Sequence, residues 1–244
     1  TINKLAPGRV ILAIGPGYTG RNTMGLPAIS VNRLKEYTRQ VQGLLSGEDV
    51  LFREGERERW IRLVHPDHES FINIKDPIPV YLAANGPRAL QAVGELADGW
   101  GTTFRSRRSL EPKFAKIANA AEQAGRVPVK PYTVALTSGC VLREGESLTS
   151  DRVVAQLGPS ILVGMHAQWE AVYGPGADLG AQPDADLAAA YNTYIQEYAE
   201  TSGTPSDRLY LDVHRGHMVF LKPGEERFAT ESALARTLTG SGPE

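Results

Sequence analysis

The spacing of apolar residues along the chain predicts strands that alternate with helices. Four short apolar runs have the length and composition of strands: 10–14, 80–84, 99–104 and 132–142. Five longer segments show helical spacing: 31–45, 87–97, 111–125, 151–173 and 184–198. A fifth strand is expected at 209–213, and residues 49–76 form a polar excursion. The alternation predicts an α/β domain with a mostly parallel sheet.

The segment from Pro77 to Trp100 has the pattern of one strand–helix–strand unit, and its first turn is suited to a ligand. The apolar run stops at Asn85-Gly86-Pro87, where the helix begins. Proline suits a first helical position because its missing N–H would have no partner there. Glycine lets a ligand approach the backbone, and free N–H groups at a helix start attract phosphate. The turn predicts a phosphorylated ligand, although Asn85 is also a good N-cap without one.

Composition and charge narrow the class of protein. The chain has 244 residues, of which 41% are hydrophobic, and its formal net charge of −2 comes from interspersed charges of both signs. This pattern favours neither nucleic acid nor an anionic membrane as a partner, and no apolar run approaches the roughly 20 residues of a membrane span. One cysteine excludes an internal disulfide, so a cytoplasmic location is the default prediction.

Five segments, taken in order, resemble the bacterial-luciferase-like flavin monooxygenase superfamily, which includes deazaflavin-dependent reductases and dehydrogenases. Residues 8–17 resemble its fourth strand and the loop after it, and residues 44–50 the end of the helix that follows. Residues 77–87 resemble the fifth strand with its phosphate loop, and residues 94–99 the approach to the sixth strand. Residues 214–217, His-Arg-Gly-His, resemble a motif in the late insertion of some members.

The resemblance implies a (β/α)8 TIM barrel that this chain contains only in part, with the first strands and the last strand missing. It also implies a single partial barrel domain over residues 1–244, with an insertion around 143–225. An unrelated α/β enzyme with an open sheet is the alternative fold. That alternative predicts that the strand at 10–14 does not lie beside the strand at 80–84.

The resemblance places a flavin-type cofactor at the carboxyl ends of the strands, where barrel active sites lie. Ten residues are the predicted contacts: Gly15, Pro16, Gly17, Tyr18, Ala84, Asn85, Gly86, Pro87, Arg88 and Thr102. Each has a simpler interpretation, because glycine and proline close strands and threonine can end one. Tyr18 stands where some sugar-phosphate-oxidising relatives have a glutamate, which argues against that chemistry.

His214 and His217 are weaker candidates, for a substrate pocket. Their separation of three residues would let them share a helix face. No metal is predicted, because neither a carboxylate nor a cysteine cluster accompanies the pair and a zinc site needs three or four ligands. His166 lies between Met165 and Trp169 in a helical segment and is interpreted as a packed core histidine.

The sequence therefore predicts a luciferase-like, flavin-dependent oxidoreductase. The main hypothesis is an FMN-dependent monooxygenase that acts on a small organic substrate and receives reduced flavin from a separate reductase. One alternative is hydride transfer with a deazaflavin coenzyme, and another is a noncatalytic flavin-binding relative. The resemblance also implies a homodimer.

Overall fold

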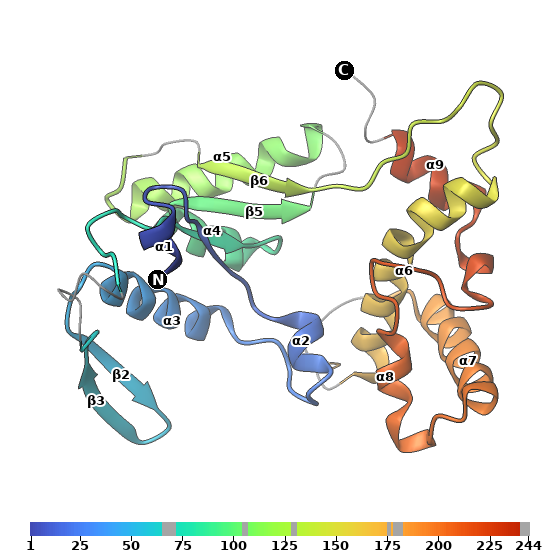
Figure 1. Ribbon diagram of the computed structural model, residues 1–244, viewed down its shortest axis with the longest axis horizontal. Helices are drawn as coiled ribbons and strands as arrows, with labels where there is room; N and C mark the ends of the chain where they lie inside the picture. Colours follow the sequence, from blue (N-terminus) through green and yellow to red (C-terminus); the bar gives the residue numbers. More distant parts are fainter. Residues whose placement is uncertain (65–71, 104–106, 128–130, 175–176, 178–182, 240–244) are drawn as a thin grey trace. The chain divides into compact units, whose positions relative to one another are not determined.

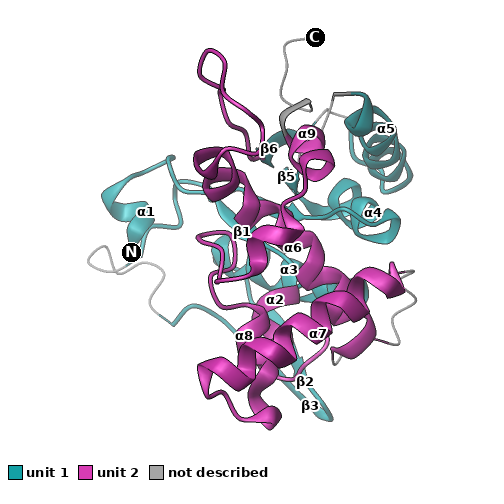
Figure 2. Ribbon diagram, turned by 90° about the vertical axis from the view of Figure 1, so that its right-hand side faces the viewer, with its two compact units in different colours: residues 1–16, 29–136 teal, residues 17–28, 137–244 magenta. Residues whose placement is uncertain are grey.

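The computed structural model describes residues 1–64, 72–103, 107–127, 131–174, 177 and 183–239. The chain divides into two compact units (Figure 2). Unit 1 comprises residues 1–16 and 29–136, and unit 2 comprises residues 17–28 and 137–244. The predicted insertion at 143–225 lies within unit 2, while its interpretation as part of a single barrel domain stays a prediction.

Figure 1 labels the elements of both units. Unit 1 contains α1 (Ile2–Leu5), β1 (Leu12–Ile14), α3 (Val31–Leu45), β2 (Val50–Glu54), β3 (Arg57–Ile61), β4 (Val80–Ala83), α4 (Pro87–Leu96), β5 (Gly99–Thr103), α5 (Arg107–Gln123) and β6 (Tyr132–Leu136). Unit 2 contains α2 (Tyr18–Asn22), α6 (Asp151–Tyr173), α7 (Ala185–Ser202), η1 (Ser206–Arg208), α8 (Leu209–Val213), η2 (Glu225–Phe228) and α9 (Glu231–Thr239). Among the described helices, none is both long and apolar enough to span a bilayer.

Unit 1 is built on a four-stranded parallel sheet with the order β1-β4-β5-β6. Leu12 pairs with Val80, so the first two apolar runs of the sequence lie side by side. This pairing contradicts the alternative of an unrelated open sheet. The α/β class and the parallel sheet are confirmed. Closure into an eight-stranded barrel, and the strands predicted to be missing, stay predictions, because the described residues contain four parallel strands.

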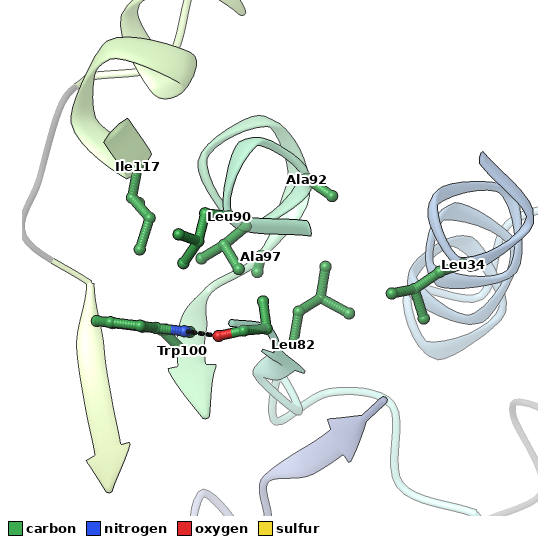
Figure 3. Packing of buried hydrophobic residues seen from close by; sticks show 9 residues of the cluster. Leu34, Leu82, Leu90, Ala92, Ala97, Trp100 and Ile117 are labelled. Atoms are coloured by element: carbon green, nitrogen blue, oxygen red, sulfur yellow. Dashed lines mark hydrogen bonds between the residues drawn. The ribbon is translucent and has the colours of Figure 1, made fainter. Parts of the chain in front are cut away.

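Helices α3, α4 and α5 pack against the sheet and supply most of its apolar core (Figure 3). Leu34 of α3 and Ile117 of α5 are buried with Leu82 and Trp100 of the strands. The Trp100 Nε1–H donates to the Ala84 carbonyl at 2.8 Å, which satisfies the one polar atom of the indole in this apolar setting (Figure 3).

The polar excursion predicted at 49–76 contains an antiparallel hairpin of β2 and β3. Gly55 has a φ of +60° in its two-residue turn, a conformation that favours glycine. Residues 65–71 of the excursion lie outside the described residues.

Unit 2 is helical, and its largest apolar cluster joins α6, α7 and α8. Two strand predictions fail in part or in full here. The strand predicted at 132–142 ends at Leu136, because Ser138 and Gly139 interrupt the apolar run. The segment 209–213 is helix α8 and not a strand. Its carbonyl groups at Asp212 and Val213 accept hydrogen bonds from the Lys222 ammonium, which stabilises the helix end.

Candidate functional site

The carboxyl ends of β1, β4 and β5 meet at one edge of the sheet, as the parallel order requires. Three predicted contact residues of unit 1 lie there in order: Gly15 after β1, Asn85 after β4 and Thr102 in β5. The Thr102 hydroxyl donates to Asn85 Oδ1 at 2.9 Å, and the Lys113 ammonium of α5 donates to the same oxygen at 3.4 Å. The amide of Asn85 is therefore held by side chains from two other elements.

The start of helix α4 lies at this edge. Gly86 occupies the N-cap position and Pro87 the first helical position, and none of the described side chains caps the turn. Asn85 is therefore not the N-cap, because its side-chain oxygen accepts from Thr102 and Lys113 instead. Arg88 follows in the first turn and is exposed. An uncapped start with an adjacent arginine suits an anionic group, since helix N–H groups and a guanidinium both favour negative charge.

The loop after β1 approaches this edge closely. A side chain at Gly15 would place its Cβ 3.3 Å from the Ala83 Cβ of the neighbouring strand, so the position favours glycine. The Pro16 carbonyl accepts from the Ile29 N–H at 3.1 Å. Gly17, with a φ of +75°, is the N-cap of α2, and the 62% exposed Tyr18 begins that helix. Both belong to unit 2, so their part in a shared cofactor site stays a prediction.

The two predicted pocket histidines lie together in unit 2, but not on a helix face. His214 ends α8 and His217 lies in the turn that follows. His217 Nδ1 is 3.4 Å from His214 Nδ1 and 2.8 Å from Nδ1 of His166. The third histidine comes from the middle of α6, and its ring stacks on that of His217 with centroids 5.0 Å apart. Sequence reasoning missed this association, because residues 166 and 217 are far apart in the chain.

A carboxylate completes the histidine cluster. His214 Nε2 contacts a carboxylate oxygen of Glu170, one turn after His166 on α6. The other Glu170 oxygen accepts from the Asn22 side-chain amide of α2 at 2.5 Å. Burial is the main cause that lowers the pKa of His166 to about 2, with His214 and Lys222 adding to it. Burial also lowers the pKa of His217. Both rings are therefore neutral near pH 7.

Lys222 fixes the turn that carries His214 and His217. Its buried ammonium pairs with Glu225 at 2.7 Å and donates to the Arg215 carbonyl at 3.4 Å, in addition to the end of α8. Glu225 also accepts from the buried Tyr191 hydroxyl at 2.8 Å. Gly216 within the turn has a φ of +82°, and a Cβ there would lie 2.7 Å from the Phe220 carbonyl oxygen. The turn therefore depends on a buried ion pair and a glycine.

A pocket of about 290 Å³ adjoins the histidine cluster within unit 2. Aromatic side chains of α6 and α8 form much of its wall, and His214 and Glu170 supply polar groups. The lining residues are Asn22, Thr23, Met24, Gly25, Trp169, Glu170, Tyr173, Gly174, Tyr210 and His214. A small apolar pocket with a few polar groups on one wall is typical of a small-molecule site.

Comparisons with known proteins agree on a family. A profile of the family described as luciferase-like monooxygenase matches residues 1–209. The chain is 28% identical over 237 residues to the F420-dependent glucose-6-phosphate dehydrogenase of Nakamurella multipartita, a match that covers 93% of this chain and 66% of that protein. It is 28% identical over 130 residues to the 5,10-methylenetetrahydromethanopterin reductase of Methanolobus tindarius, covering 52% of this chain and 38% of that one.

Among solved structures, the coenzyme F420 dependent tetrahydromethanopterin reductase from Methanopyrus kandleri matches with a TM-score of 0.49 and 15% identity, covering 96% of this chain and 75% of that one. The chain spans less than two thirds of the length of the two relatives compared by sequence. The profile nevertheless covers most of the chain and all four strands of the parallel sheet. The resemblance predicted from the sequence is confirmed, and the chain belongs to the luciferase-like monooxygenase family of oxidoreductase enzymes.

Proposed function

We propose that the chain is part of an oxidoreductase that transfers hydride with the deazaflavin coenzyme F420. The uncapped start of α4 at the carboxyl edge of the sheet is the observation that carries the proposal, since it suits an anionic cofactor. The relative from Nakamurella multipartita and a second one from Kineococcus radiotolerans, 26% identical over 245 residues, are both named F420-dependent. The names of these relatives favour the deazaflavin alternative over the FMN hypothesis.

The FMN hypothesis depends on Tyr18. This residue stands where some sugar-phosphate-oxidising relatives have a glutamate. The absence of one substrate-related residue says little about the cofactor. The absence of the glutamate bears on the substrate instead. The names of the relatives also differ in the substrate, which is a sugar phosphate in one and a pterin in the other. We therefore propose the cofactor and the reaction type and assign no substrate.

In this proposal the β4–α4 turn binds the anionic part of the cofactor. Backbone N–H groups at the start of α4 donate to it, and Arg88 adds a charged donor. Gly86 leaves open space where a side chain would stand, so the backbone is accessible. Thr102 and Lys113 hold Asn85 in one orientation at the same edge. F420 supplies a hydride donor or acceptor when bound, and the protein contributes position and exclusion of water.

Binding titrations of the purified protein test this proposal. F420 and FMN are added separately under anaerobic conditions, and quenching of their fluorescence reports binding. We expect F420 to bind at least tenfold more tightly than FMN. Arg88→Ala should weaken F420 binding by about tenfold, because one charge-assisted hydrogen bond is lost. Arg39→Ala, which removes an exposed arginine from α3 of the same unit, is the matched control and should leave binding unchanged.

The outcomes separate the alternatives. Tight FMN binding without F420 binding would support the FMN-dependent monooxygenase hypothesis instead. If neither cofactor binds, the F420 proposal and the FMN hypothesis both fail, and so does the prediction of a phosphorylated ligand at the β4–α4 turn. If Arg88→Ala and Arg39→Ala lose affinity for F420 equally, the β4–α4 turn is not part of the cofactor site.

A further inference from the structure

The three histidines of unit 2 form a cluster in which one ring nitrogen of each lies close to those of the others. One ring nitrogen from each of His166, His214 and His217 lies within 4.8 Å of the others. Two zinc-bound nitrogens in a tetrahedral site, each about 2.0–2.1 Å from the ion, lie roughly 3.3 Å apart. The Nδ1 contacts of His217, at 2.8 and 3.4 Å, fall on either side of that separation.

Hydrogen bonding alone does not satisfy this arrangement. The contact of His214 Nε2 with the Glu170 carboxylate places a hydrogen on Nε2, so Nδ1 of a neutral His214 presents a lone pair. His217 Nδ1 carries at most one hydrogen, which can serve His214 or His166 but not both. In every neutral tautomer, at most one of the two contacts has a hydrogen directed along it, and without a hydrogen on His217 Nδ1 the contact with His214 brings two lone pairs together. A cation accepts lone pairs from all three rings and removes this conflict.

Burial and charge around the cluster also suit a cation. His166 is 2% exposed, and its Nε2 has no partner among the described residues. A metal ion binds the lone pair of an imidazole nitrogen, and each of the three histidines offers one such nitrogen. The Lys222 charge close by is compensated by Glu225, and Asp212 and Glu170 add further negative charge.

We propose that His166, His214 and His217 bind one divalent transition-metal ion, with Zn²⁺ as the best match. Imidazole ligands suit zinc and its neighbours, whereas Mg²⁺ and Ca²⁺ prefer oxygen ligands. Glu170 acts as the outer carboxylate that orients a ligating histidine, and Asn22 holds Glu170 in turn. Three protein ligands leave one position of a tetrahedral ion for water or a small anion.

This site shares no residue with the proposed F420 site and does not rest on it. Every residue that forms it belongs to unit 2, whereas the β4–α4 turn belongs to unit 1. His214 and Glu170 also line the 290 Å³ pocket, so a small molecule bound there lies beside the metal ligands. The sequence does not indicate this metal site, because His166 and His217 are 51 residues apart in the chain.

Metal stoichiometry and affinity test the proposal without any activity assay. The purified protein is stripped with a chelator and titrated with Zn²⁺ and with Co²⁺, whose visible absorption reports tetrahedral nitrogen coordination. We expect one ion per chain, a rise in Tm with Zn²⁺, and no response to Mg²⁺. His217→Gln should weaken binding at least a hundredfold and abolish the rise in Tm. Glu170→Gln should weaken it about tenfold to a hundredfold, as outer-carboxylate changes do.

Tyr210→Phe is the matched control, because Tyr210 lines the pocket but carries no imidazole. It should bind Zn²⁺ as the unmodified protein does. The proposal is overturned if fewer than half the chains bind an ion, or if His217→Gln binds Zn²⁺ with unchanged affinity. If His217→Gln does not fold, unchanged Zn²⁺ affinity in Glu170→Gln overturns the proposal in its place.

Discussion

The two units differ in what they bury. In unit 1 the core beneath the sheet is apolar, and the polar groups of the candidate cofactor site stand at the edge. In unit 2 the described interior contains His166, Asp212, Lys222 and Glu225 beside the aromatic cluster. Buried charges are stable only when they are paired and hydrogen-bonded. Unit 1 therefore depends on close packing, and unit 2 depends on the completeness of a polar network.

The largest effect is expected from breaking the buried ion pair of unit 2. Lys222→Met leaves the Glu225 carboxylate buried without its cation and frees the carbonyl groups at the end of α8. We expect the free energy of unfolding to fall by about 3–5 kcal/mol. Urea unfolding followed by circular dichroism measures it.

The control for this change is an exposed pair of the same unit. Arg208→Met removes the partner of Asp207, whose side chain is 75% exposed. It should change the free energy of unfolding by less than about 0.5 kcal/mol. A loss below about 1 kcal/mol in Lys222→Met would mean that unit 2 does not depend on its buried network.

Close packing in unit 1 predicts the next largest effect. Gly94 of α4 faces α5 so tightly that an added Cβ would lie 2.3 Å from the Ile117 carbonyl oxygen and 2.9 Å from the Ala121 N. Gly94→Ala should therefore cost about 1–3 kcal/mol through overpacking. Thermal unfolding of the variant against the unmodified protein measures this loss, and an unchanged Tm would show that α4 and α5 can separate freely.

The matched substitution in unit 2 should have the opposite sign. Gly164 lies in α6, is exposed, and an added Cβ would meet nothing within 4 Å. Gly164→Ala should stabilise the protein by up to about 1 kcal/mol, because alanine favours a helix more than glycine does. The same thermal measurement tests this prediction. A fall in Tm would mean that another part of the protein packs against this face of α6.

These comparisons also explain how much the sequence could predict. Alternating apolar runs predicted the four parallel strands, and Pro87 predicted the start of α4, because both signals are local. Asn85 was a plausible N-cap until its partner Thr102 was known, and that contact spans 17 residues. The histidine cluster depends on a contact over 51 residues. No local sequence pattern indicates a contact over this distance, so the polar interior of unit 2 could not be predicted.

The smallest effect concerns a largely covered carboxylate of unit 2. Glu146 accepts from Arg152 Nε at 2.8 Å, from the Arg143 N–H at 2.9 Å and from the Ser150 hydroxyl, which is the N-cap of α6. The hydrogen bonds from Arg152 and Arg143 lower the pKa of Glu146 from 4.5 to about 2. A lowered carboxyl pKa stabilises the folded state above the unfolded value, and this stabilisation is lost as the pH falls toward 2.

The substitution Glu146→Gln tests that pH dependence. Its Tm should lie slightly below that of the unmodified protein near about pH 6, and the difference should shrink toward about pH 3 because the Glu146 carboxyl of the unfolded chain takes up a proton before that of the folded chain. Thermal scans over this range measure the two curves. A difference that stays constant with pH would assign the effect to side-chain shape and not to charge.

The register of the parallel sheet has a consequence for the order of folding. Tyr81 of β4 pairs with Gly99, 18 residues later, whereas Leu12 pairs with Val80, 68 residues away. Closing the longer loop costs more chain entropy, so the β4–α4–β5 unit should form before β1 joins it. Pulsed hydrogen exchange should then protect the Ala84 N–H, bonded to Gly101, earlier than the Leu12 N–H, bonded to Pro79. The β4–α4 turn, where the cofactor is proposed to bind, would thus form in the refolding chain before β1 joins the sheet.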